Sequence, residues 1–392
     1  MRARRRIGWC SSIGTLLLGG AALMGCSDGL PTGTTNGVRV VWSVRDPQGS
    51  SVRPHVDGAI AVFASNTREV SAFRTSDGRR LWRRFLPPVT GGTPFAIPFP
   101  IPSSSMVASG NTVVIAGWDL YGLDRDSGDL RWVFAPADQV SATALIVEGD
   151  GVIFTVGATA IFAVDAATGQ QRWRRDLVAE TPERPFAPLF HEGVVYLGGR
   201  QILSGTQGVG DDGHVWALDA DTGDLLWRTP TLGVVGQVAV HENLVLAGTI
   251  GAERFALDRA TGVVLWSREA IMNESFDRGT VVVDGIALFT SSTGAIWAVD
   301  PVTGEDVWNE TPVLAGIDRQ VVTGGGQVIL TTLGPMWGVN ASDGSLAWFF
   351  GGVRPLVIFN SAATWFEGRV YASANDFQEG GGGFYALEPP SQ

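Results

Sequence analysis

The sequence contains no lysine, because all 28 of its basic residues are arginine. A chain without lysine cannot form a Schiff base or use a lysine amine as general base, which excludes those classes of enzyme. Cysteine is almost as rare, with Cys10 and Cys26 as the two examples. We expect cleavage before Cys26, for reasons given below, and the mature chain would then keep one cysteine and form no internal disulfide.

Histidine is also scarce, and the common catalytic signatures are missing. No two of the four histidines have the spacing of metal ligands (His55, His191, His214 and His241). Three of them fall near the end of an expected first strand or in its turn, where we expect solvated side chains. The sequence has no G-x-S-x-G elbow, P-loop or H-E-x-x-H motif. It therefore predicts no catalytic residue.

One glycine-rich stretch could bind a cation. "GVGDDGH", residues 208–214, contains Asp211 and Asp212, whose carboxylates could bind Ca²⁺. Two adjacent acids without further ligands are a weak signal, and a flexible hairpin tip is the simpler interpretation. We therefore predict no metal site.

Runs of basic residues are absent beyond the first six positions. The formal net charge is −11, so the body of the chain is acidic. An acidic surface is repelled by nucleic acid and by anionic membrane surfaces, which argues against both as partners.

The first 25 residues have the layout of an export signal. Four arginines precede the apolar stretch "IGTLLLGGAALM", which is too short to span a bilayer and ends at "LMGC". This segment resembles a bacterial lipoprotein signal, which implies removal of residues 1–25 and lipidation of Cys26. Residues 26–37 are then a flexible tether. The resemblance implies a lipid-anchored protein of the cell envelope, at the outer membrane and facing the periplasm; a plain secretory signal and an uncleaved anchor helix are the alternatives.

A repeat of about forty residues organises the rest of the chain. Each of seven copies has a tryptophan four residues after a glycine: Gly78 and Trp82, Gly128 and Trp132, Gly169 and Trp173, Gly223 and Trp227, Gly262 and Trp266, Gly304 and Trp308, Gly344 and Trp348. An acid stands four residues before the glycine in five copies (Asp124, Asp165, Asp219, Asp258 and Asp300). Such periods indicate a solenoid, propeller or array.

One unit, residues 142–174, predicts four short strands. "ATALIV", "VIFTV", "IFAVD" and "QQRWR" are separated by tight turns, which is typical of one blade of a β-propeller. The last third strand, "FYALEPP", has no fourth strand after it. "VRVVWSV" at residues 38–44 carries Trp42, and we expect this N-terminal strand to complete the last blade. Closure would remove the exposed sheet edges of a linear array.

The repeats resemble the quinoprotein-type propeller family with PQQ-like repeats. "AVDAATGQQRW" matches the tryptophan-docking motif of that family at Ala163, Asp165, Thr168, Gly169 and Trp173. The resemblance covers residues 38–388 and implies an all-β, eight-bladed β-propeller with four-stranded antiparallel blades. Asp165, Gly169 and one tryptophan per blade would then be structural docking residues: Trp42, Trp82, Trp132, Trp173, Trp227, Trp266, Trp308 and Trp348.

Length, blade count and the lipoprotein signal resemble the BamB family of scaffold lipoproteins in the outer-membrane β-barrel assembly machinery. The resemblance implies a non-catalytic protein-interaction scaffold without a cofactor. Its partners would be envelope proteins, with the barrel-assembly complex first, and the membrane through lipid on Cys26. One alternative is a periplasmic oxidoreductase dependent on PQQ with Ca²⁺, although this chain lacks the adjacent cysteines typical of such alcohol dehydrogenases. Another is a ligand- or polysaccharide-binding envelope propeller.

Three departures from the repeat indicate a binding face. Insertions at residues 85–105, 198–213 and 375–383 join strands at the same end of their blades, opposite the "TG" turns, and repeat proteins often bind partners there. The first insertion is proline-rich and apolar (Phe85, Phe95, Ile97, Phe99 and Ile101). We expect it either to bind a protein partner as an exposed patch or to plug the mouth of the propeller.

Overall fold

The computed structural model describes the larger of two compact units, which are residues 1–33 and 34–392. The described residues are 37–50, 52–65, 67–88, 106–117, 119–136, 146–178, 183–202, 209–232, 236–251, 253–269, 276, 279–291, 293–310, 321–332, 334–351, 357–359, 363–376 and 381–390. Within these ranges the regular structure is entirely β-strand. The described ranges contain no helix with the length and hydropathy needed to cross a membrane.

Burial along the strands follows their distance from the rim. In blade 3 the second strand, β11 (Val152–Val156), is buried at every position because blades pack against both of its faces. The fourth strand, β13 (Gln171–Asp176), buries only Trp173 fully. Apolar runs therefore become inner strands, while the mixed "QQRWR" pattern becomes an outer strand with one buried ring.

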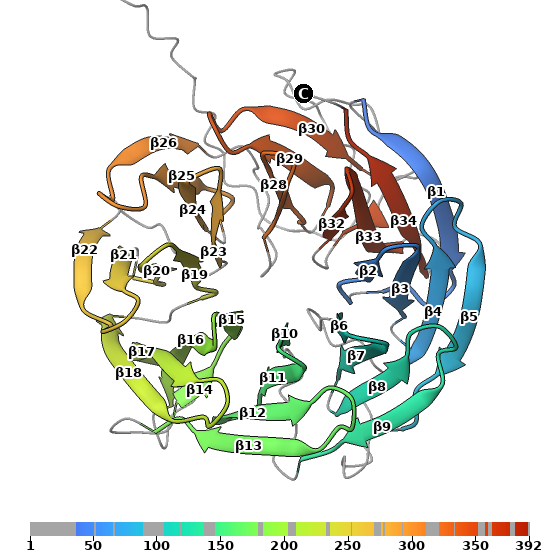
Figure 1. Ribbon diagram of the computed structural model, residues 1–392. Helices are drawn as coiled ribbons and strands as arrows, with labels where there is room; N and C mark the ends of the chain where they lie inside the picture. Colours follow the sequence, from blue (N-terminus) through green and yellow to red (C-terminus); the bar gives the residue numbers. More distant parts are fainter. Residues whose placement is uncertain are drawn as a thin grey trace, which may run out of the picture. The chain divides into compact units, whose positions relative to one another are not determined.

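Eight antiparallel sheets form a ring (Figure 1). From the centre outward, the strands of the first four blades are as follows: blade 1, β2 (His55–Asp57), β3 (Ile60–Ala64), β4 (Glu69–Arg74) and β5 (Arg80–Phe85); blade 2, β6 (Met106–Ser109), β7 (Thr112–Ala116), β8 (Leu120–Asp124) and β9 (Leu130–Phe134); blade 3, β10 (Val147–Gly149), β11, β12 (Ala160–Asp165) and β13; blade 4, β14 (Glu183–Pro185) with β15 (Leu189–His191), then β16 (Val194–Ile202), β17 (Val209–Asp219) and β18 (Leu225–Leu232).

The other four blades complete the ring. Their strands are as follows: blade 5, β19 (Ala239–His241), β20 (Leu244–Gly248), β21 (Glu253–Asp258) and β22 (Val264–Glu269); blade 6, β23 (Gly279–Val283), β24 (Ile286–Thr290), β25 (Ile296–Val299) and β26 (Asp306–Glu310); blade 7, β27 (Val322–Gly324), β28 (Gln327–Leu330), β29 (Met336–Asn340) and β30 (Leu346–Phe350); blade 8, β31 (Val357–Ile358) with β32 (Thr364–Phe366), then β33 (Arg369–Asp376), β34 (Gly382–Glu388) and β1 (Arg39–Asp46).

The N-terminal strand closes the ring. β1 pairs with the C-terminal strand β34 in antiparallel register, with Trp42 opposite Ala386, and the two lie side by side at the rim in Figure 1. The predicted fold class, eight four-stranded antiparallel blades closed by the N-terminal strand, is therefore confirmed.

Two local predictions need correction. In blade 3 the first strand begins only at Val147 rather than at residue 142, and residues 142–145 lie outside the described part of the chain. The stretch around Asp211 and Asp212 is not a free hairpin tip, because β17 runs through it. Gly213 pairs with Arg200 on one side and with Thr231 on the other, so the ladder extends well past the usual blade height.

Turns of two kinds share one face of the ring. In each antiparallel blade, the turn between the first and second strands and the turn between the third and fourth strands emerge at the same end. We call them the 1–2 and 3–4 turns, and the "TG" sequences lie in the 3–4 turns. The turns between second and third strands lie on the opposite face, where the insertion at residues 198–213 extends β16 and β17.

Candidate interaction surfaces

The 3–4 turn is built by the acid that precedes its glycine. In blade 3, Asp165 Oδ1 accepts hydrogen bonds from the backbone N–H of Ala167 and Thr168 at 3.1 and 3.0 Å, and from the Thr168 hydroxyl at 2.9 Å. The hydrogen bond from the Arg172 guanidinium is the main reason that the pKa of Asp165 lies below its usual range, and the two bonds from Thr168 lower it further. Gly169 follows with φ of 71°, a conformation that glycine adopts without strain.

Each such turn receives a tryptophan from the preceding blade. Trp173 Nε1 donates a 2.9 Å hydrogen bond to the carbonyl of Ala220 in blade 4. A Cβ added to Gly223 would lie 2.7 Å from the Trp173 ring, so only glycine lets the ring approach this closely. Trp173 is 9% exposed, so on folding its indole leaves water, hydrogen-bonds to one carbonyl and packs against the turn.

Six other joints repeat this bond. Each indole N–H reaches the carbonyl of the first residue in the next blade's 3–4 turn: Trp42 to Thr75, Trp82 to Arg125, Trp132 to Ala166, Trp227 to Arg259, Trp266 to Pro301, and Trp308 to Ala341. These tryptophans lie around the rim and do not converge on one site. Their geometry holds neighbouring blades at a fixed spacing.

Trp348 is the exception. Its Nε1 donates to Gln327 Oε1 of its own blade at 2.7 Å instead of reaching across the joint. Val38 stands four residues before Trp42, where seven other copies have glycine, and it packs in one apolar cluster with Trp348. The Val38 side chain occupies the space that the tryptophan ring takes at the other joints. Trp348 therefore bonds to Gln327 of its own blade.

Of the five apolar residues predicted to bind a partner, the structure describes Phe85. Phe85, at the end of β5, is 64% exposed, and the Arg83 guanidinium lies 5.1 Å from its ring centroid. The other four apolar residues and the predicted lipidation site lie outside the described residues: Phe95, Ile97, Phe99, Ile101 and Cys26.

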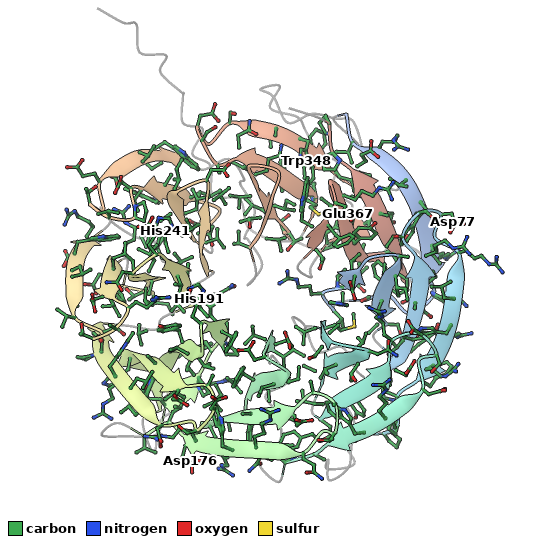
Figure 2. The ribbon with its side chains drawn as sticks, in the orientation of Figure 1. Asp77, Asp176, His191, His241, Trp348 and Glu367 are labelled. Carbon is green, nitrogen blue, oxygen red and sulfur yellow. The ribbon has the colours of Figure 1, made fainter. Side chains whose placement is uncertain are left out.

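The histidines occupy unlike surroundings. His191 and His241 end the inner strands β15 and β19 and are partly exposed (Figure 2). His55, in β2, differs from the expected solvated turn residue because its Nε2 is buried without a hydrogen-bond partner. Desolvation lowers the pKa of His55 to about 4, so the ring is neutral at physiological pH.

Blade 4 contains a buried polar cluster that the sequence did not predict. Glu183 is 1% exposed and accepts a hydrogen bond from Trp216 Nε1 at 2.9 Å. Its other carboxylate oxygen is hydrogen-bonded to His214 Nδ1. The separation of 31 residues between Glu183 and His214 gives no local signal. Only the unusually long β16 and β17, which bring β14 into the sheet, place the two side chains together.

A second buried acid lies where β1 ends. Asp46 is 5% exposed; its Oδ1 accepts a 3.0 Å bond from the backbone N–H of Gln48, and its Oδ2 is buried without a partner. Burial raises the pKa of Asp46 to about 6, partly opposed by the Gln48 bond. Within the described ranges, neither this acid nor any other belongs to a group of three or more His, Cys, Asp and Glu that could hold a metal ion.

Comparison with protein families gives a match along most of the chain. Residues 32–145, 116–348 and 255–389 match the family described as "Outer membrane protein assembly factor BamB". The BamB of Moranella endobia is 25% identical over 315 residues, which cover 76% of this chain and 76% of that protein. A crystal structure of BamB from Moraxella catarrhalis superposes with a TM-score of 0.66 at 21% identity, covering 90% of this chain and 97% of that one.

Quinoprotein enzymes also match. The quinoprotein alcohol dehydrogenase PedH of Pseudomonas putida is 28% identical over 205 residues. That match covers 44% of this chain and 32% of the enzyme, so the chain spans about a third of PedH.

Proposed function

The chain belongs to the BamB family of outer membrane protein assembly factors, and from this premise we propose that it is a non-catalytic scaffold lipoprotein of the bacterial cell envelope that serves outer-membrane protein assembly. The observation that carries the proposal is the extent of the family match, which runs through all eight blades. A match restricted to single repeats would support the blade architecture alone.

The insertion face supplies the surface for a protein partner in this proposal. Phe85 exposes most of its ring at the point where the insertion of residues 85–105 leaves β5. An exposed aromatic anchor beside an arginine is the kind of residue that dominates protein–protein binding energy. The same face carries the extended β16–β17 hairpin.

Crosslinking in isolated envelopes tests this surface. The full-length lipoprotein would be lightly crosslinked, recovered by affinity and examined by mass spectrometry, alongside a variant that lacks residues 88–102. We expect barrel-assembly subunits with the wild type and their loss with the deletion. Phe85→Ser should weaken recovery, while Leu226→Ser, at a half-exposed rim position on β18, serves as the matched control. Recovery of no stable partner by the wild type would refute the scaffold proposal.

The membrane attachment that we propose rests on Cys26. Replacing the acceptor thiol by Cys26→Ser removes the site for the acyl chains, and several chains are needed for stable anchoring. We expect the wild type in the membrane pellet and the variant in the soluble periplasmic extract after fractionation. A variant that stays in the pellet would show that another element holds the protein.

A quinone-dependent oxidoreductase is the second candidate, favoured by the match to PedH. Two observations weigh against a PQQ–Ca²⁺ site of the expected kind. The sequence has no adjacent cysteines, and its described residues contain no cluster suited to a metal ion. Titration with PQQ in the presence of Ca²⁺ separates the candidates, because saturable binding of one equivalent would contradict a scaffold without a cofactor.

A further inference from the structure

A surface pocket lies at the joint between blades 7 and 8, where the two ends of the propeller meet. Its volume is about 720 Å³, within the range of small-molecule sites. We call it the seam pocket. The side chains that matter for its chemistry are Arg39, Gln327, Trp365, Glu367, Arg369 and Glu388.

Side chains fill the corresponding space at two other joints. Between blades 4 and 5, Arg259 of one 3–4 turn forms an ion pair with Glu192 of the neighbouring 1–2 turn, with Nη1 and Oε2 2.6 Å apart. Between blades 1 and 2, Arg125 of the 3–4 turn forms an ion pair with Asp57, the last residue of β2 before the 1–2 turn. Each pair bridges the gap between turns on this face of the ring.

At the seam pocket, neither turn of the joint carries such a side chain. Gly325 occupies the tip of the 1–2 turn, where blade 4 has Glu192. Pro389 occupies the position that Arg259 has in blade 5, because each is the first residue after the third strand of its blade. A glycine facing a proline cannot form an ion pair, so no salt bridge crosses the pocket between these two turns.

Gln327 gives the pocket a buried donor. This side chain is 3% exposed, and its Oε1 accepts the hydrogen bond from Trp348. An indole N–H is only a donor, so this bond fixes which end of the amide is oxygen. The amide nitrogen, Nε2, is therefore the other terminal atom of the side chain. Among the described residues it has no acceptor, and Gln327 lines the pocket.

Trp365 provides a flat apolar wall. Its ring lies across the backbone of the 1–2 turn of blade 7, where a Cβ on Gly325 would come within 2.9 Å of Cζ2. The side chain is partly exposed, and its remaining surface lines the pocket. The absence of side chains at Gly324 and Gly325 is what allows the ring to lie flat at this place.

The charges that line the pocket balance. Arg39 forms an ion pair with Glu388 across the β1–β34 ladder, and Arg369 donates to the carbonyl of Thr75 at 3.2 Å. Glu367, in the 1–2 turn of blade 8, supplies the fourth charge. Two guanidinium and two carboxylate groups leave no net charge, so the pocket favours a neutral ligand over an anion or a cation.

We propose that the seam pocket binds a neutral carbohydrate segment. Sugar hydroxyls both donate and accept, so they pair with the Gln327 amide as donor and with the Glu367 carboxylate as acceptor. The apolar face of a sugar ring matches the Trp365 wall. The volume accommodates more than one sugar ring, and the open side of the pocket permits a longer chain to continue. The proposal does not depend on the scaffold role.

Calorimetric titration of the full chain tests the site with three neutral probes. The probes are N-acetylchitotriose, maltotriose and tri-alanine. We expect saturable binding of at least one trisaccharide, with a dissociation constant in the millimolar range or tighter, on the order of −4 kcal/mol. Tri-alanine should not bind. No heat of binding from either trisaccharide, or equal binding of tri-alanine, would overturn the assignment.

Variants locate the binding to this pocket. Gln327→Glu keeps an acceptor for Trp348 but replaces the donor nitrogen by oxygen, and Glu367→Ala removes the acceptor. Each should weaken binding about fivefold or more, the loss expected for one hydrogen bond. Glu242→Ala is the matched control, because Glu242 has a similar left-handed turn position in blade 5. Trp365→Phe keeps an aromatic ring but makes the apolar wall smaller, so it should also weaken binding, and it serves if Gln327→Glu unfolds. Undiminished binding by Glu367→Ala and Trp365→Phe would place the ligand elsewhere and refute the proposal.

Discussion

Removing the Trp173 ring tests how strongly one docking joint stabilises the propeller. Trp173 is almost fully buried, donates a hydrogen bond to the Ala220 carbonyl and packs against Phe154, with the ring centroids 5.9 Å apart and the ring planes tilted by 41°. Trp173→Ala deletes this ring and leaves a cavity between two rigid blades that cannot collapse onto each other. We expect a loss of roughly 3 to 5 kcal/mol in the free energy of unfolding.

Two further variants divide that loss. Trp173→Phe keeps an aromatic ring but no N–H, so the Ala220 carbonyl loses its partner and we expect roughly 1 to 2 kcal/mol. Leu226→Ala, at a half-exposed rim position, should change stability by about 0.5 kcal/mol or less. Urea unfolding followed by circular dichroism gives these differences from the transition midpoints. A Trp173→Ala protein that unfolds at the wild-type midpoint would show that the ring does not lock the joint.

Three other substitutions test buried features. Burial raises the pKa of Asp46 from its usual value of 3.8 to about 6 in the folded protein, so its contribution to stability is present below pH 4 and is lost as the pH rises through 6. Asp46→Asn should therefore stabilise the protein by roughly 1 to 3 kcal/mol at pH 8 and change little at pH 4, measured by urea unfolding; equal effects at both pH values would contradict the assigned ionisation. His214→Ala leaves the buried Glu183 carboxylate with one partner and should cost roughly 2 to 4 kcal/mol, whereas an unchanged melting temperature would argue against the pair. Gly223→Ala should lower the melting temperature more than Gly193→Ala, because both glycines have positive φ but only Gly223 touches a tryptophan; equal shifts would mean that strain alone matters.

The periodic features of the fold could be predicted because they depend on short-range sequence. A glycine four residues before a tryptophan encodes a turn and an outer strand within one segment, and Trp42 has the same spacing from Trp82 as an uninterrupted repeat. Blade number and closure follow from counting such segments. The inner strands were harder to predict because they are short, and in blades 4 and 8 two separate segments pair with the second strand: β14 and β15 in blade 4, β31 and β32 in blade 8.

The sites that depend on contacts between distant residues could not be predicted in this way. Glu183 and His214 meet only because β16 and β17 extend beyond the ordinary blade. The seam pocket had a visible signal, since Val38 replaces the expected glycine and Gly325 replaces the acid of other turns. The pocket itself could not be predicted from these two positions, because its shape depends on how Trp348 and Trp365 pack.

Closure by the two chain ends also sets the order in which the protein can be completed. Arg39 in β1 and its partner Glu388 in β34 are 349 residues apart in sequence. At a synthesis rate of about 5 to 20 residues per second, β1 waits roughly 20 to 70 s for its partner to be made. During that time "VVWSV" is an unpaired apolar strand of the kind that pairs with other chains. The charged residues at its two ends, Arg39 on one side and Arg45 with Asp46 on the other, act as gatekeepers that disfavour aggregation until the last strand arrives.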